Sequence, residues 1–88
     1  MASVRLEFFG VARSRANVAT IDLEASDLRN VTAQLAQQFP DLAELCLVDD
    51  QVASGWLLNI NGARFTRDLD TTLHDGDSIL LMPADAGG

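Results

Sequence analysis

Residues 73–88 read "LHDGDSILLMPADAGG", and this stretch decides the fold. A turn signal, Asp75-Gly76, precedes the run 78–82, whose last four residues are all apolar. An unbroken apolar run of this length is typical of a strand covered on both faces, in the middle of a sheet. We expect the strand to end at Met82, with Pro83 where the chain leaves the sheet, because proline lacks the N–H that a ladder needs.

The first part of the chain predicts a hairpin. Residues 4–9, "VRLEFF", alternate between apolar and other positions, which indicates a strand. Residues 18–24, "VATIDLE", alternate again, with Ala19, Ile21 and Leu23 pointing inward. We expect the intervening "GVARSRAN", residues 10–17, to be a polar connection.

Residues 25–40, "ASDLRNVTAQLAQQFP", change to a helical period. Their apolar positions recur at spacings of three and four: Leu28, Val31, Leu35 and Phe39. Ser26 or Asp27 is a suitable N-cap, and Pro40 cannot continue the helix. The pattern predicts one amphipathic helix whose apolar stripe faces a sheet.

The region between this helix and the last strand is mixed. Residues 41–55 predict an irregular connection with a short helical piece, because acidic residues and Gly55 interrupt any long element. In residues 56–66, the pair Asn61-Gly62 lies between apolar runs and suits the two positive φ angles of a type I′ hairpin turn.

The order of elements predicts an α+β domain. The first and last strands are the most apolar, so we expect them to be central neighbours that pair in parallel, with the main helix covering one face of a mixed sheet of four to five strands. The expected organisation is a single domain over residues 1–82 followed by a flexible tail, residues 83–88.

Composition excludes several functions. The 88 residues carry a net charge of −7, which disfavours nucleic acid, and all six basic residues are arginines. Without lysine there is no Walker-type loop and no Schiff-base chemistry. No segment is a signal peptide or a membrane span, so we expect a cytoplasmic protein with no membrane partner. With no convergent acid–base set, no metal cluster and no bound cofactor expected, we predict that the chain is not an enzyme.

Several single residues are candidates for reactivity or binding. Cys46, the only cysteine, lies between two leucines and is expected to be buried rather than reactive. His74 is expected in a surface turn. Four aspartates precede the last strand, and we interpret them as turn formers and caps: Asp68, Asp70, Asp75 and Asp77. Together with Asp85, they are also expected to give a negative charge to the docking end, the end of the domain that would contact a partner.

Three segments together resemble a known family. These are "VRLEFFGVAR" (4–13), "LNING" (58–62) and "TLHDGDSILLMPADAGG" (72–88). They are similar to the β-grasp, ubiquitin-like sulfur carriers of the MoaD and ThiS branch, where an "NG" hairpin is followed by "L.DGD.I...P...GG". The resemblance implies a β-grasp fold and a working C-terminus.

In that family an E1-like adenylyltransferase of the MoeB or ThiF type uses ATP to adenylate the terminal glycine carboxylate. A sulfur donor then converts the adenylate to a thiocarboxylate. The resemblance places this chemistry at Gly88, with Gly87 beside it. Glycines suit a narrow partner channel because they lack a Cβ. The residues expected to contact partners are Pro83, Ala84, Asp85, Ala86, Phe9 and Met82. Trp56, Leu57 and Leu80 are further candidates for an apolar docking patch or, alternatively, for the core.

Three functions fit these residues. The first is the small subunit of molybdopterin synthase, whose larger MoaE-type subunit accepts the sulfur, although Ala84 and Asp85 depart from the expected "PPVxGG" tail. The second is a carrier for another pathway, of the cysteine (CysO-like) or thiamine (ThiS-like) type; "PAxAGG" tails of the cysteine type match residues 83–88 better. The third is a ubiquitin-like modifier conjugated through Gly88. A frayed end with no function is the plain alternative.

Overall fold

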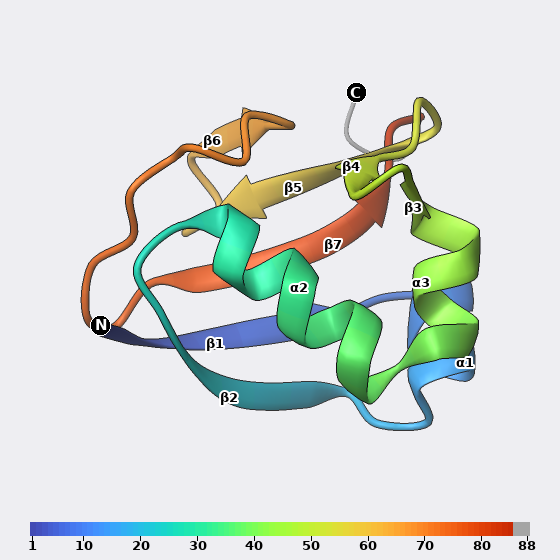
Figure 1. Cartoon of the computed structure of the whole chain (residues 1–88), viewed down its shortest axis with the longest axis horizontal. Coiled ribbons are helices and arrows are strands. Elements are labelled where there is room, and N and C mark those ends of the chain that lie inside the picture. The colour runs from blue at the N-terminus through green and yellow to red at the C-terminus, as the bar shows by residue number, and fades with distance from the viewer. Residues whose placement is uncertain (86–88) are drawn as a thin grey trace.

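The computed structural model describes residues 1–85 and contains a five-stranded mixed sheet covered on one face by helix α2 (Figure 1). The strand order is β2-β1-β7-β5-β6. The strands are β1 (Ala2–Phe8), β2 (Thr20–Ala25), β5 (Trp56–Ile60), β6 (Arg64–Thr66) and β7 (Ser78–Pro83). The helices are α1 (Val11–Ala16), α2 (Leu28–Gln38) and α3 (Pro40–Cys46), and a small separate hairpin pairs β3 (Leu47–Val48) with β4 (Gln51–Val52).

The predicted pairing of the first and last strands is confirmed. Strand β1 pairs with β7 in parallel, from Arg5 opposite Ser78 to Phe8 opposite Leu81. Strand β5 pairs with the other edge of β7, so β7 lies in the centre of the sheet and is apolar because neither face is fully open to water. The predicted α+β class, the β-grasp arrangement and the mixed sheet are therefore correct.

The last strand extends one residue further than the sequence predicts. Pro83 belongs to β7 and lies opposite Trp56. Proline is tolerated here because the next residue supplies the donor: the Ala84 N–H donates to the Gly55 carbonyl oxygen at 2.8 Å.

Helix α2 begins and packs largely as predicted. The Asp27 side chain accepts the Asn30 N–H at 2.9 Å, which makes Asp27 the N-cap. The buried apolar side chains of α2 include Leu28, Val31 and Leu35, which face the sheet. Phe39 lies just beyond the helix, yet its ring packs edge-to-face on Phe8 with centroids 5.5 Å apart.

Residues 10–17 form a helix where the sequence predicts a polar connection. Helix α1 buries Ala12 and Ala16, which are four residues apart and share a helical face. Asn17, in the left-handed region with φ 62°, ends it. The signal is weak in sequence because a six-residue helix with two small apolar residues has little periodicity.

Two further boundaries differ. Ala19 precedes β2 and is exposed, whereas Ala25, expected in the helix, is the buried last residue of β2. In the region 41–55, Pro40 starts a seven-residue helix because proline suits the first helical position, and the β3–β4 hairpin follows it.

The Asn61-Gly62 turn is confirmed. Both residues have positive φ, 58° and 71°, and the Ala63 N–H donates to the Ile60 carbonyl at 3.0 Å. Within residues 1–85, no helix is both long and apolar enough to cross a bilayer.

Candidate functional site

The C-terminal tail leaves the sheet at one edge, together with the end of the first strand. Because β1 and β7 are parallel, their last residues, Phe8 and Pro83, lie at the same end of the sheet. We call this border of the sheet, where these two strands end, the tail edge. Phe9 follows directly and is 56% exposed. The sequence-predicted Phe9 and Pro83 are therefore brought to the same end of the molecule, although they are far apart in sequence.

The first residues of the tail are fixed to the sheet. Ala84 is half-buried and its N–H is bound to Gly55, whereas Asp85 is exposed. The remaining predicted tail residues, Ala86, Gly87 and Gly88, lie outside the described residues, and their roles stay predictions.

A side chain that the sequence analysis does not identify lies beside this point. The Arg67 Nε–H donates to the Trp56 carbonyl at 2.6 Å, and its Nη2 donates to the Ser54 carbonyl at 2.7 Å. These two carbonyls flank Gly55, whose own carbonyl binds the tail. No sequence pattern indicates this contact, because an arginine after a short strand is ordinarily a solvated surface residue.

The sheet face opposite α2 carries an apolar patch, which we call the outer-face patch: Leu57, Phe65, Leu80 and Met82. Leu57 and Asn59 are two positions apart on β5 and therefore point to the same face of the sheet. Met82 lies opposite Leu57, and both Phe65 and Leu80 lie opposite Asn59, so all of these residues share that face. Phe65 is 51% exposed and Met82 only 8%. Met82 therefore offers little surface in the free protein, and Phe65 is an additional exposed ring.

Trp56 does not belong to this patch. It is buried among the core side chains, on the face that α2 covers. Of the five apolar residues considered for docking, Phe9 is exposed, Leu57 and Leu80 are half-buried, and Trp56 is in the core. The alternation of β5 places Trp56 and Leu57 on opposite faces.

The predicted negative charge at the docking end is wrong for two aspartates. Asp75 and Asp77 lie at the start of β7, at the end of the sheet opposite the tail edge. The Asp75 Oδ1 accepts the Ser3 N–H at 2.8 Å near the start of β1. Of the other two, Asp68 accepts the Asp70 N–H and Asp70 pairs with an arginine of α2, so both are turn or ion-pair residues.

Asp77 connects the two motifs that define the C-terminal half. Its Oδ1 accepts from Asn61 Nδ2 and its Oδ2 accepts the His74 N–H, both at 2.8 Å. These donors favour the charged form and lower the pKa of Asp77. Asn61 also accepts the Ser78 N–H, so the "NG" and "DGD" segments are joined directly. The two segments therefore occur together in the sequence because their side chains stabilise each other's loops.

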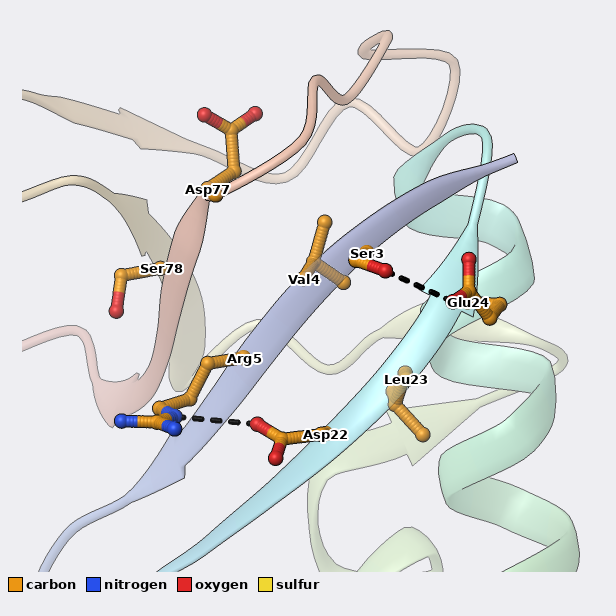
Figure 2. A pocket seen from close by; sticks show the side chains of 9 residues that line it. Ser3, Val4, Arg5, Asp22, Leu23, Glu24, Asp77 and Ser78 are labelled. Atoms are coloured by element: carbon orange, nitrogen blue, oxygen red, sulfur yellow. Dashed lines mark hydrogen bonds and ion pairs between the residues drawn. The ribbon is translucent and has the colours of Figure 1, made fainter.

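An open hollow lies at this same end, away from the tail edge. It measures about 480 Å³ and is open, between the starts of β1 and β7 and the end of β2 (Figure 2). Its charged side chains bind one another: Arg5 pairs with Asp22 at 3.1 Å, and the Ser3 hydroxyl donates to Glu24 (Figure 2). It therefore lies at the end of the sheet opposite the point where the chain leaves β7.

Cys46 and His74, the only cysteine and histidine of the sequence, lie where the sequence predicts them. Cys46 is fully buried, and this desolvation raises the pKa of its thiol to about 11, so it is not a nucleophile at neutral pH. His74 lies in an exposed turn. Among residues 1–85, no three His, Cys, Asp or Glu side chains are arranged to hold a metal ion.

This fold defines a class: a ubiquitin-like β-grasp domain whose central C-terminal strand continues into a tail, with Ala84 still bound to the turn at Gly55. The chain belongs to the ThiS family, whose model matches residues 6–88. The resemblance to MoaD- and ThiS-like sulfur carriers is thereby confirmed. Members of this group are small carrier or modifier proteins.

Three solved structures of similar fold come from different organisms. The small archaeal modifier protein 1 from Methanosarcina acetivorans is 26% identical, with a TM-score of 0.84 over 100% of this chain and 98% of that one. A putative molybdopterin converting factor subunit 1 from Pyrococcus furiosus is 19% identical, with a TM-score of 0.74 over 94% and 98%.

The third is the Amycolatopsis orientalis BexX/CysO complex, 15% identical, with a TM-score of 0.79 over 97% of this chain and 99% of that one. At these identities the last two likenesses concern the fold alone. The search of curated protein sequences gave no match.

Proposed function

We propose that this protein is a sulfur carrier whose Gly88 carboxylate is adenylated by an E1-like enzyme and then converted to a thiocarboxylate. The observation that carries the proposal is the tail: it follows the central strand directly, at the edge where Phe9 is exposed, and its sequence ends in two glycines. Membership of the ThiS family supports the same chemistry.

Activation proceeds by two substitutions, one at the α-phosphate of ATP and one at the carbonyl carbon of Gly88. The carboxylate oxygen of Gly88 attacks the α-phosphate of ATP and displaces pyrophosphate, giving an acyl adenylate. A sulfide or persulfide sulfur then attacks the carbonyl carbon and AMP leaves; with a persulfide, a reductant of the thiol class releases the thiocarboxylate. The bare carboxylate lacks a leaving group, and adenylation supplies one.

For the acceptor, we propose the large subunit of a molybdopterin synthase first. The "FFGVAR" opening and the proline before the tail support it. A cysteine- or thiamine-pathway enzyme is the alternative, and Ala84 and Ala86 favour the cysteine type. The cytoplasm is the proposed location, since an E1-like partner needs ATP.

Protein modification is a second candidate function. The likeness at 26% identity to a small archaeal modifier protein favours it. Because the chain has no lysine, it would be conjugated singly and would not build lysine-linked chains on itself.

Mass spectrometry distinguishes these functions. The chain is incubated with an E1-like enzyme, ATP and sulfide, and cleaved with trypsin, which leaves residues 68–88 as the C-terminal peptide because Arg67 is the last basic residue. A carrier gains about 16 Da on this peptide, oxygen replaced by sulfur. An unchanged peptide mass with several activating enzymes would overturn the carrier proposal, and heavier conjugates in cell extracts would support the modifier.

Acceptor choice is tested by transfer. The thiocarboxylated chain is mixed either with a molybdopterin synthase large subunit and its pterin precursor or with a cysteine-synthase-like enzyme and its activated amino-acid substrate. Loss of the added mass in only one mixture identifies the acceptor. Loss in the second mixture alone would contradict the molybdopterin assignment.

A further inference from the structure

The turn that holds the base of the tail has no side-chain packing at its tip. Its two central residues, Ser54 and Gly55, are exposed, and within residues 1–85 no atom lies within 4 Å of the position of a Cβ at Gly55. The turn is closed by the Trp56 N–H, which donates to Ala53 at 3.0 Å. Backbone hydrogen bonds therefore determine where this turn lies.

Arg67 supplies two of those bonds from the side where the sheet has ended. The last pair of β5 with β6 joins Leu58 to Thr66, so no strand faces the carbonyls that precede Leu58 on that side. The guanidinium fork of Arg67 takes this place and donates to both Ser54 and Trp56. A charged donor binds a carbonyl more strongly than a neutral one.

The opposite side of the same turn holds the tail. The Gly55 carbonyl accepts the Ala84 N–H at 2.8 Å, and Trp56 lies opposite Pro83. All four carbonyls of the turn are thus satisfied: one within the turn, two by Arg67 and one by the tail. The ion pairs within residues 1–85 involve Arg5 and Arg29, so no carboxylate of this part competes for Arg67.

We propose that Arg67 is the positioning residue of the C-terminal tail. It fixes the 53–56 turn, and the turn fixes the direction in which the chain leaves the sheet after Pro83. The proposal rests on the proposed function, because a defined direction matters when the tail enters a partner's narrow site. Loosening the base lowers the fraction of chains ready to bind, which raises the apparent dissociation constant and leaves the chemical step unchanged.

The test compares Arg67→Gln with Arg64→Gln. Arg64 lies on the neighbouring strand β6, is exposed, and makes no side-chain hydrogen bond or ion pair within residues 1–85, so both variants lose the same charge. Exchange of the Ala84 amide with water, followed by NMR, is expected to accelerate roughly tenfold in Arg67→Gln alone. Thermal unfolding of both variants is followed in parallel.

The second measurement is activation. With an E1-like enzyme, ATP–pyrophosphate exchange by Arg67→Gln is expected to show a KM for the carrier raised roughly three- to tenfold, with kcat unchanged. Arg67→Lys, which keeps one charged donor, is expected to recover part of the loss. A merely destabilising substitution would lower the unfolding temperature without this KM-specific effect and without rescue by lysine.

Two results would overturn the proposal: equal Ala84 exchange in the two glutamine variants, or faster exchange with an unaltered KM. If the wild-type chain is not adenylated at all, the carrier function fails. The amide exchange still decides whether Arg67 holds the base of the tail.

Discussion

At the residue scale, the motifs that resemble the sulfur carriers have distinct tasks. Asn61 and Asp77 hold two loops together at one end of the sheet, whereas Pro83 and Ala84 lead the chain out at the other. The motif residues therefore divide into a group that joins the two loops and a group that leads the chain out of the sheet. Their proximity in sequence does not reveal this division.

The carboxylate of Asp77 is expected to make stability pH-dependent. Because two donors lower its folded-state pKa, it stabilises the fold at pH values above the ordinary carboxyl pKa, and this contribution is lost as the pH falls through the folded-state value. Asp77→Asn is expected to lower the free energy of unfolding by about 0.5–1 kcal/mol at pH 7. Urea unfolding should show the difference shrinking below about pH 4.

The matched control for Asp77→Asn is Glu44→Gln on α3. It removes the same charge from a side chain that makes no hydrogen bond or ion pair within the described residues. A pH-independent loss in Asp77→Asn, or an equal loss in the control, would contradict the assignment.

Two glycines provide a paired test of backbone conformation. Gly62→Ala places a side chain at φ +71° and is expected to cost about 1 kcal/mol, because an L-residue is strained in the left-handed region. Gly55→Ala meets no atom of the described residues within 4 Å and has no positive φ, so it is expected to be neutral or slightly stabilising. Chemical unfolding measures both; equal losses would contradict the assignment of the cost to the positive φ of Gly62.

At the element scale, α2 supplies most of the helical side of the core. Leu28, Val31 and Leu35 face the sheet, and Phe39 completes the contact just beyond the helix end. The short helices α1 and α3 pack against each other; α1 adds the small buried residues Ala12 and Ala16, and α3 adds the fully buried Leu42 and Cys46. The base of the tail is bound to the sheet, and α2 packs on one face of that sheet.

Leu35→Ala is expected to remove a large part of the stability. Leu35 is 3% exposed, and a leucine-to-alanine change in a core costs about 2–5 kcal/mol through lost burial and the cavity that remains. Val48→Ala on the exposed β3 is the control and is expected to cost less than about 0.5 kcal/mol. Thermal unfolding would contradict this assignment of the core if the two losses were similar.

At the scale of the whole molecule, the parallel pairing of the first and last strands gives the domain two unlike ends. One end gathers the loop hydrogen bonds of Asp75 and Asp77; the other gathers Phe9, Arg67 and the base of the tail. The loop hydrogen bonds and the point where the chain leaves the sheet are thereby separated in space. Changes to the tail are expected to leave folding intact.

Deletion of Gly88 is expected to abolish activation by the E1-like enzyme and leave the unfolding temperature nearly unchanged. The reason is that the hydrophobic core is built from residues between Ala2 and Leu81, whereas the carboxylate that we propose to be adenylated belongs to Gly88. ATP–pyrophosphate exchange and thermal unfolding measure the two effects, with Gly88→Ala as the length control. A large loss of stability would show that the last residue contributes to the fold.

The sequence by itself determined the features that depend on local periodicity and backbone chemistry. These include the central strand 78–82, the start of the main helix at Ser26 or Asp27 and the Asn61-Gly62 turn. Each follows from residues within a few positions of one another, where hydrophobic period, hydrogen-bonding side chains and allowed φ angles decide the outcome.

The tertiary structure alone decided which distant residues meet. It brought Phe9 to the edge where Pro83 leaves the sheet, moved Asp75 and Asp77 to the opposite end, and placed Arg67 against the turn at Gly55. It also gave residues 11–16 a helix, because Ala12 and Ala16 gain burial only against the assembled domain. Such contacts depend on strand order and register, which a local pattern does not encode.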